Sequence, residues 1–228
     1  MIDRILDLSY SWRIAWLIFF MLIMVHYDWR KNGSQSRRWK EYLFILAIGG
    51  IGMVYLLIAN AITGSISHEF FYYMQDAPED ETFRMAVAIK SLQIGFPVGV
   101  VCGGALVAAN NPKPGLAPLP WKRLFVLAFV PIVFGVLCSP FTAIISVLFD
   151  PLRFGSKLAP LISKEPEKLQ RFLAIWGVTI GIYLGGIAGT IYAAVKIRSE
   201  RNAIREKARA AAPPTPRLDS DTSPEPAK

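Results

Sequence analysis

Histidine and cysteine are scarce in this sequence, and their scarcity limits the chemistry available to the chain. Its 228 residues include two histidines, His26 and His68, and two cysteines, Cys102 and Cys138. Both cysteines fall within long apolar segments and lack the paired spacing of a metal site, so no disulfide framework is implied. We expect both to pack as small apolar side chains.

The zinc metalloprotease pattern H-E-x-x-H also fails. His68 and Glu69 begin such a pattern, in which two histidines one helical turn apart bind the metal, but position 72 is a tyrosine. We expect His26 at the opposite membrane surface. No nucleophile with a base, acid pair or ligand cluster is visible. The sequence therefore predicts no catalytic residue, no metal and no cofactor.

Charge is sparse in four long segments, and each is long enough to cross a bilayer, which takes about 20 predominantly apolar residues. They are residues 42–64, 86–110, 124–149 and 172–195. The second is apolar only from Ile94 onward, so its helix should begin earlier and carry Lys90 near one end. Pro97, Pro131 and Pro140 predict kinks. The expected fold class is all-α: a polytopic integral membrane bundle with four core transmembrane helices and an amino-terminal fifth helix.

The amino-terminal helix, within residues 1–30, allows two interpretations. The segment "YSWRIAWLIFFMLIMVHYDW" is apolar enough for a short transmembrane helix, and the "HYDWRKN" that ends it has no small-residue cleavage pattern. The alternative is a helix lying in the membrane interface. The tryptophans at positions 12, 16 and 29 suit both, because indoles favour the headgroup level.

The distribution of charge predicts the orientation. Residues 31–41 form a basic connection, the loop after the first core helix is rich in acids, and the segment after the last span is again basic. Because cytoplasmic loops carry excess lysine and arginine, 31–41 and the carboxy terminus are assigned to the cytoplasm. The mixed loop 150–171 is assigned outside by alternation. Topology accounts for the net charge of +8 without a nucleic-acid partner.

These assignments divide the chain into four parts. After residues 1–30 and the basic cytoplasmic loop 31–41 comes a four-helix transmembrane core, 42–196, and then 197–228. The last part should start as a basic helix of good helix formers. From residue 212 the prolines and polar residues of "PPTPRLDSDTSPEPAK" predict a disordered cytoplasmic tail.

The stretch "SHEFFYYM" leaves the first core span. Its four rings, at positions 70 to 73, predict an interfacial aromatic belt. A partner or ligand site on this loop is the alternative. Lys90 should snorkel to the same surface. The sharper alternative for it is an outer-face ion pair with Glu69 or Asp150.

Glycines recur every four residues in two of the spans, and each series forms a flat stripe on its helix. Such stripes let helix backbones approach closely in lipid. Packing within the chain, a homo-oligomer and a glycine-lined pore are the alternatives, the pore lacking a supporting ring of polar residues. The stripes comprise Gly95, Gly99 and Gly103 in one span and Gly177, Gly181, Gly185 and Gly189 in the other.

The sequence also resembles a group of bacterial multispan membrane proteins with no known activity. Ile66, Ser67, Glu69, Phe70 and Phe71 match an I-S-x-E-[FY]-F-like stretch of that group, and residues 183–186 match its Y-L-G-G-like last span. The resemblance covers residues 42 to about 198 and implies a four-helix membrane core. The amino-terminal helix departs from it.

The expected function is that of a non-enzymatic component of the bacterial inner membrane. Besides the lipid bilayer, its expected partners are a second copy or another membrane protein, bound through the glycine-striped helices. A small transporter or channel subunit is the alternative, although the spans hold few polar side chains to outline a path. A membrane enzyme ranks third.

Overall fold

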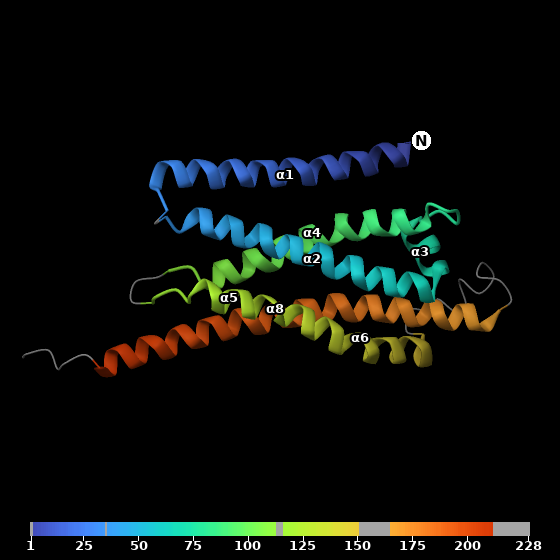
Figure 1. Ribbon diagram of the computed structural model, residues 1–228. Helices are drawn as coiled ribbons and strands as arrows, with labels where there is room; N and C mark the ends of the chain where they lie inside the picture. Colours follow the sequence, from blue (N-terminus) through green and yellow to red (C-terminus); the bar gives the residue numbers. More distant parts are fainter. Residues whose placement is uncertain (1, 35, 113–115, 151–164, 212–228) are drawn as a thin grey trace, which may run out of the picture.

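The computed structural model shows an elongated all-helical bundle (Figure 1). It describes residues 2–34, 36–112, 116–150 and 165–211. Four stretches of helix in this part of the chain are long and apolar enough to cross a membrane. The predicted fold class, an all-α bundle able to span a bilayer, is confirmed.

The helices follow one another in the order that the apolar segments predicted. They are α1 (Ile2–Asn32), α2 (Arg38–Ile66), α3 (His68–Gln75), α4 (Phe83–Ala109), α5 (Trp121–Ala128), α6 (Val130–Phe149) and α8 (Pro166–Ala211). The basic connection is shorter than 31–41, because α1 ends at Asn32 and α2 already begins at Arg38. The tail from 212 onward and most of the loop 150–171 lie outside the described residues.

The four core spans pack as two helix pairs. One pair is α2 with α4, the other is α5–α6 with α8, and the contact within each pair is much more extensive than the contact between them. Figure 1 shows α8 as the longest rod, extending past the other helices at its carboxy-terminal end. Its 46 residues make a helix about 70 Å long. The last span therefore continues as a polar helix, as the sequence predicted.

The third span is interrupted once. Residues 124–149 were predicted as one helix, whereas the structure begins earlier, at Trp121, and breaks between α5 and α6 at Phe129. Pro131 lies in the first turn of α6, where its ring lacks an N–H and would clash with the carbonyl group four residues earlier if the helix were continuous. Pro97 and Pro140, by contrast, lie inside uninterrupted helices.

The bundle has two chemically different ends. We call one the basic end; it comprises the α1–α2 turn, residues 110–120 between α4 and α5, and α8 from Lys196 to Ala211. We call the other the acidic end; it comprises α3, the loop 76–82 and the first turn of α4. In Figure 1 the basic end lies on the left and the acidic end on the right.

The amino-terminal helix α1 lies alongside α2 and also touches α4 (Figure 1). Near the acidic end the Tyr10 hydroxyl donates to the carbonyl oxygen of Gln93 at 3.2 Å. At the basic end the Asp28 carboxylate accepts a hydrogen bond from the Trp39 backbone N–H at 3.0 Å. The 18 residues from one contact to the other span about 27 Å of helix. α1 is therefore aligned with the core spans over nearly the thickness of a bilayer's hydrocarbon region.

The aromatic stretch at positions 70 to 73 differs from a uniform interfacial belt. It folds into α3, in which Phe70 and Phe71 are buried, Tyr73 is half-buried and Tyr72 is exposed. Phe70 packs beside Phe172 of α8, with ring centroids 5.8 Å apart. α3 contacts both α2 and α8 and so links the two helix pairs at the acidic end. Its short helix directs Phe70 and Phe71 into the bundle and leaves Tyr72 exposed.

Candidate functional site

The glycines of α4 form the seam with α2. A Cβ atom at Gly95 would lie 2.5 Å from the Gly52 carbonyl oxygen, and one at Gly103 would lie 3.2 Å from the Cα of Ile45. Gly99 lies against the backbone of Ile48 and Gly49. Backbone therefore meets backbone along this seam, and a side chain at these positions would separate the helices.

The second glycine stripe forms the seam between α8 and α6. A Cβ at Gly181 would lie 2.5 Å from the Cα of Ser139, and one at Gly189 would lie 2.6 Å from the Cα of Pro131. Gly177 and Gly185 face α6 in the same way. Both stripes are thus covered by helices of the same chain, so another copy or a partner would have to use a different surface.

The proposed pair of Glu69 and Lys90 is not formed among the described residues. Glu69 accepts a hydrogen bond from the Ser67 hydroxyl at 3.0 Å, and no ion pair joins it to Lys90. Lys90 lies seven residues into α4, about 10 Å along the helix from its start, whereas Glu69 belongs to the first turn of α3. This separation in depth explains why the two charges do not meet.

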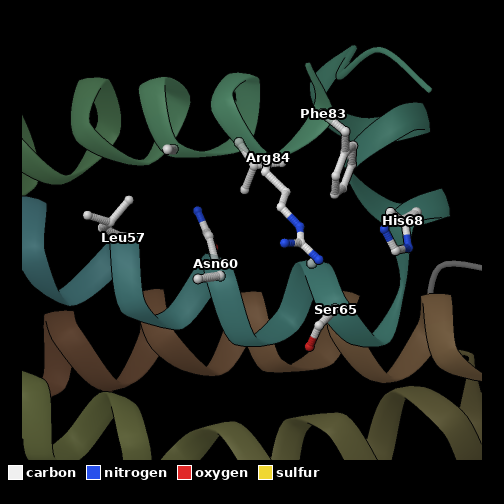
Figure 2. Close-up of a pocket in the computed structure, with 10 residues that line it drawn as sticks. Leu57, Asn60, Ser65, His68, Phe83 and Arg84 are labelled. Carbon is white, nitrogen blue, oxygen red and sulfur yellow. The ribbon is translucent and has the colours of Figure 1, made fainter. Parts of the chain in front are cut away.

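A cavity of about 400 Å³ opens between α2 and α4 at the acidic end (Figure 2). Its walls include no acidic residue, and most of them are apolar. The lining residues are Leu57, Asn60, Ala61, Gly64, Ser65, His68, Phe83, Arg84, Val87 and Ala88. This acidic-end pocket is the candidate functional site.

Arg84 is the only cation in the wall of the pocket. Its side chain extends from the first turn of α4 toward α2 (Figure 2), and its guanidinium group makes no hydrogen bond or ion pair with any residue that the structure describes. The first turn of α4 contains no acid, and the positive end of the helix dipole disfavours an arginine there. An anion bound in the pocket would compensate the positive charge of Arg84 and the partial positive charge at the start of α4.

The floor and the outer wall of the pocket are held in place by polar and aromatic contacts. The Asn60 amide on α2 donates to the Ser91 hydroxyl on α4 at 2.9 Å, and the Gly52–Gly95 contact lies deeper in the same seam. On the outer side the His68 ring packs against Phe83, with centroids 4.5 Å apart. The Ser65 hydroxyl is directed away from Arg84 in Figure 2 and donates to the backbone carbonyl oxygen of Ile62.

A larger cavity, about 520 Å³, lies between the two helix pairs. Its lining is almost entirely apolar, and Thr190 directs its hydroxyl within it toward the Cys102 sulfur at 3.3 Å. It lies at the level of the apolar parts of the spans and contains no charged side chain in its lining. The acidic-end pocket combines a charge with apolar walls, which makes it the better candidate for a specific ligand.

At the basic end, the structure shows an arginine site that sequence reasoning missed. The Arg201 side chain is buried and donates to the carbonyl oxygens of Ala109 at 2.7 Å, Asn111 at 2.8 Å, Leu116 at 3.1 Å and Ala117 at 3.1 Å. The guanidinium group caps the end of α4 and fixes the connection that follows. We call this arrangement the Arg201 clamp.

Two neighbouring contacts strengthen the clamp. The Asn110 side chain exchanges two hydrogen bonds with the backbone of Leu119, at 2.8 and 3.2 Å. Arg123 binds both carboxylate oxygens of Glu200, at 2.5 and 3.0 Å. Arginine suits such contacts because its planar group donates in several fixed directions. Arg201 and Arg123 therefore bind acceptors of the protein itself.

Asp28 is a second residue that the sequence did not single out. Its carboxylate binds the hydroxyl of Ser36 at 2.5 Å, the amide of Asn32 at 2.6 Å and the N–H of Trp39 in the first turn of α2. The bond from Ser36, assisted by Asn32, Trp39 and the charge of Arg38, holds the pKa of Asp28 below its usual value, although burial acts against this. Asp28 thus caps α2 from the neighbouring helix.

Comparison with known proteins adds no relative. No family model matches the chain, and neither a curated protein nor a solved structure matches it. The fold defines the class as a multispan helical membrane protein, and the acidic-end pocket gives it a mostly apolar cavity with one arginine at one end of the bundle.

Proposed function

We propose that this chain is a non-enzymatic component of the bacterial inner membrane that binds a ligand in the acidic-end pocket. The observation that supports the proposal is the position of Arg84: its guanidinium group enters the pocket from α4 and is compensated by no described acid. Arg84 is exposed, so its N–H donors are accessible to a ligand that reaches the pocket. The apolar walls provide the remaining contact area.

The proposal places the acidic end outside and the basic end, with the carboxy terminus, in the cytoplasm. The concentration of arginine and lysine at the basic end supports this orientation. α1 then forms a fifth span, with its first residues outside, because it runs parallel to the core from Tyr10 to Asp28. Reporter fusions after Lys31 and after Ala77 test this assignment; a cytoplasmic signal at Ala77 would reverse it.

The bilayer itself is the partner of the exposed apolar surface in this proposal. Large apolar side chains on α1, including Trp12, Trp16 and Phe20, are exposed. A homo-oligomer or a complex with another membrane protein would use such a face, since both glycine seams are already filled. The alternative, a small transporter or channel subunit, requires the seam below the pocket to open at the Gly52–Gly95 contact.

The experiment is identification of the molecules that copurify with the full chain. Mass spectrometry of material released from the wild type and from Arg84→Gln should show at least one species that is lost in the variant. Arg171→Gln is the matched control, because Arg171 is also an exposed arginine near the acidic end but pairs with Glu167 at 3.6 Å. Identical sets of copurifying molecules in all three proteins would contradict the proposal.

A further inference from the structure

The head of the ligand must suit a guanidinium group and an imidazole ring. Arg84 on α4 and His68 at the start of α3 both line the pocket (Figure 2). A phosphate or carboxylate group accepts well from arginine, since the planar fork of N–H donors matches two oxygen atoms. The acids of the adjacent loop, Glu79 and Glu81, are exposed and are not part of the wall.

The rest of the ligand must suit an apolar wall. Below Arg84 the pocket is lined by Leu57 and Ala61 of α2 and by Val87 and Ala88 of α4. Ala88 lies one helical turn, about 6 Å, deeper than Arg84. The Asn60 side chain belongs to the same wall, and its amide is held by the Ser91 hydroxyl. Charge at the opening and hydrocarbon below it match the two parts of an amphiphile.

We propose that the pocket binds an anionic amphiphile, with its phosphate or carboxylate group on Arg84 and His68 and its apolar chain between α2 and α4. The inference rests on the proposed function and specifies the ligand class of the same site. Exposed residues in the wall, Ala61 and Arg84, open the pocket toward the surroundings of the bundle. A lipid can thus enter sideways without passing through the seam.

Native mass spectrometry of the full chain in an uncharged maltoside detergent tests this inference. The probes are lysophosphatidylglycerol, a monoacylglycerol of the same chain length and inorganic phosphate. The wild type should bind the anionic lysolipid at least about tenfold more tightly than either other probe. Arg84→Gln should lower that affinity about tenfold or more, because a charge-assisted hydrogen bond is lost, whereas Arg84→Lys should retain part of it.

Two further variants separate the head from the chain. Ala61→Phe should fill the apolar part of the pocket and weaken the lysolipid severalfold, while Arg171→Gln should change nothing. If the monoacylglycerol binds as tightly as lysophosphatidylglycerol, the pocket does not recognise an anionic head group. If inorganic phosphate binds as tightly as lysophosphatidylglycerol, the pocket does not recognise an apolar chain. In both of those cases an Arg84-dependent copurifying molecule would still support the proposed function. If no probe and no copurifying molecule depends on Arg84, both proposals fail.

Discussion

Arginines at the two ends of the bundle have opposite surroundings. Arg201 at the basic end is buried and donates to four backbone carbonyls, whereas Arg84 at the acidic end faces a cavity and binds no described residue. A side chain whose donors are all used by the protein contributes to the fold. One whose donors point into a cavity is available for a ligand. The two arginines therefore differ in whether the protein itself satisfies their donors.

Replacing Arg201 should have the largest effect on stability. In Arg201→Met several buried carbonyl oxygens at the end of α4 lose their donor, and each costs about 1–3 kcal/mol when unsatisfied. We expect the free energy of unfolding to fall by roughly 3 kcal/mol or more, measured by thermal unfolding in detergent. The neighbouring exposed Arg198, changed to methionine, is the control. If Arg201→Met and the Arg198 variant unfold at similar temperatures, the Arg201 clamp does not stabilise the fold.

A methyl group in the closed seam should cost less than loss of the clamp. Gly95→Ala places a Cβ against the carbonyl oxygen of Gly52, and overpacking of this kind costs about 1–3 kcal/mol. Gly64, in the wall of the pocket, has room: its Cβ would lie 3.6 Å from Phe71. Gly64→Ala should be neutral or stabilising by up to about 1 kcal/mol, since alanine is the better helix former. Equal destabilisation would mean that the seam is as tight at the pocket as below it.

Acid should weaken the basic end through Asp28. Because its folded-state pKa is lowered, its contribution to stability is complete above the unfolded value of about 3.9. That contribution is lost as the pH falls below this value and through the lower folded pKa. The fluorescence of Trp29 and Trp39, near this cap, should report the change between about pH 5 and pH 2. Asp28→Asn should remove that part of the pH dependence; an unchanged profile would count against the cap.

Replacing Arg84 should have the smallest effect on stability. Arg84→Gln removes no protein hydrogen bond, so the free energy of unfolding should change by no more than about 0.5 kcal/mol. Thermal unfolding of protein freed of copurifying molecules checks this. A loss comparable with that of Arg201→Met would show that Arg84 supports the fold, and the contrast between the two ends would disappear.

The sequence predicts the spans well because apolar length is a local property. The break at Phe129 and the burial of Phe70 and Phe71 are harder to predict from the sequence, because both depend on how neighbouring helices cover a residue. The Glu69–Lys90 pair was suggested by charge alone, whereas the structure places the two residues at different depths. Spacing along a helix is readable from a sequence, but depth relative to another helix is not.

The Arg201 clamp did leave a signal in the sequence. The four-residue period of α8 runs through Gly189 and Ala193 to Ile197 and Arg201, and each of these residues is buried. Four residues turn a helix about 40° more than a full circle, so the stripe rotates from α6 toward the end of α4. A count of basic residues predicts the orientation of the chain but does not distinguish Arg201 from its exposed neighbours, whereas its place on the stripe does.

The acidic-end pocket left a weaker signal. Asn60 and Gly64 share a face of α2, and Arg84, Ala88 and Ser91 share a face of α4, but only the pairing of the two helices brings these faces together. In the sequence Arg84 was simply a basic residue within an acidic loop. Whether Arg84 pairs with an acid depends on which acids lie near it in the folded chain, and a single sequence does not define those distances.

The Arg201 clamp also has a consequence for synthesis of the chain. Its donor follows its acceptors by 84 to 92 residues, so the carbonyl groups at the end of α4 have no arginine to bind until the last helix has left the ribosome. The basic end closes only after Arg201 has been synthesised. Protease sensitivity of the connection between α4 and α5 thus distinguishes a chain that contains α8 from one that stopped before it.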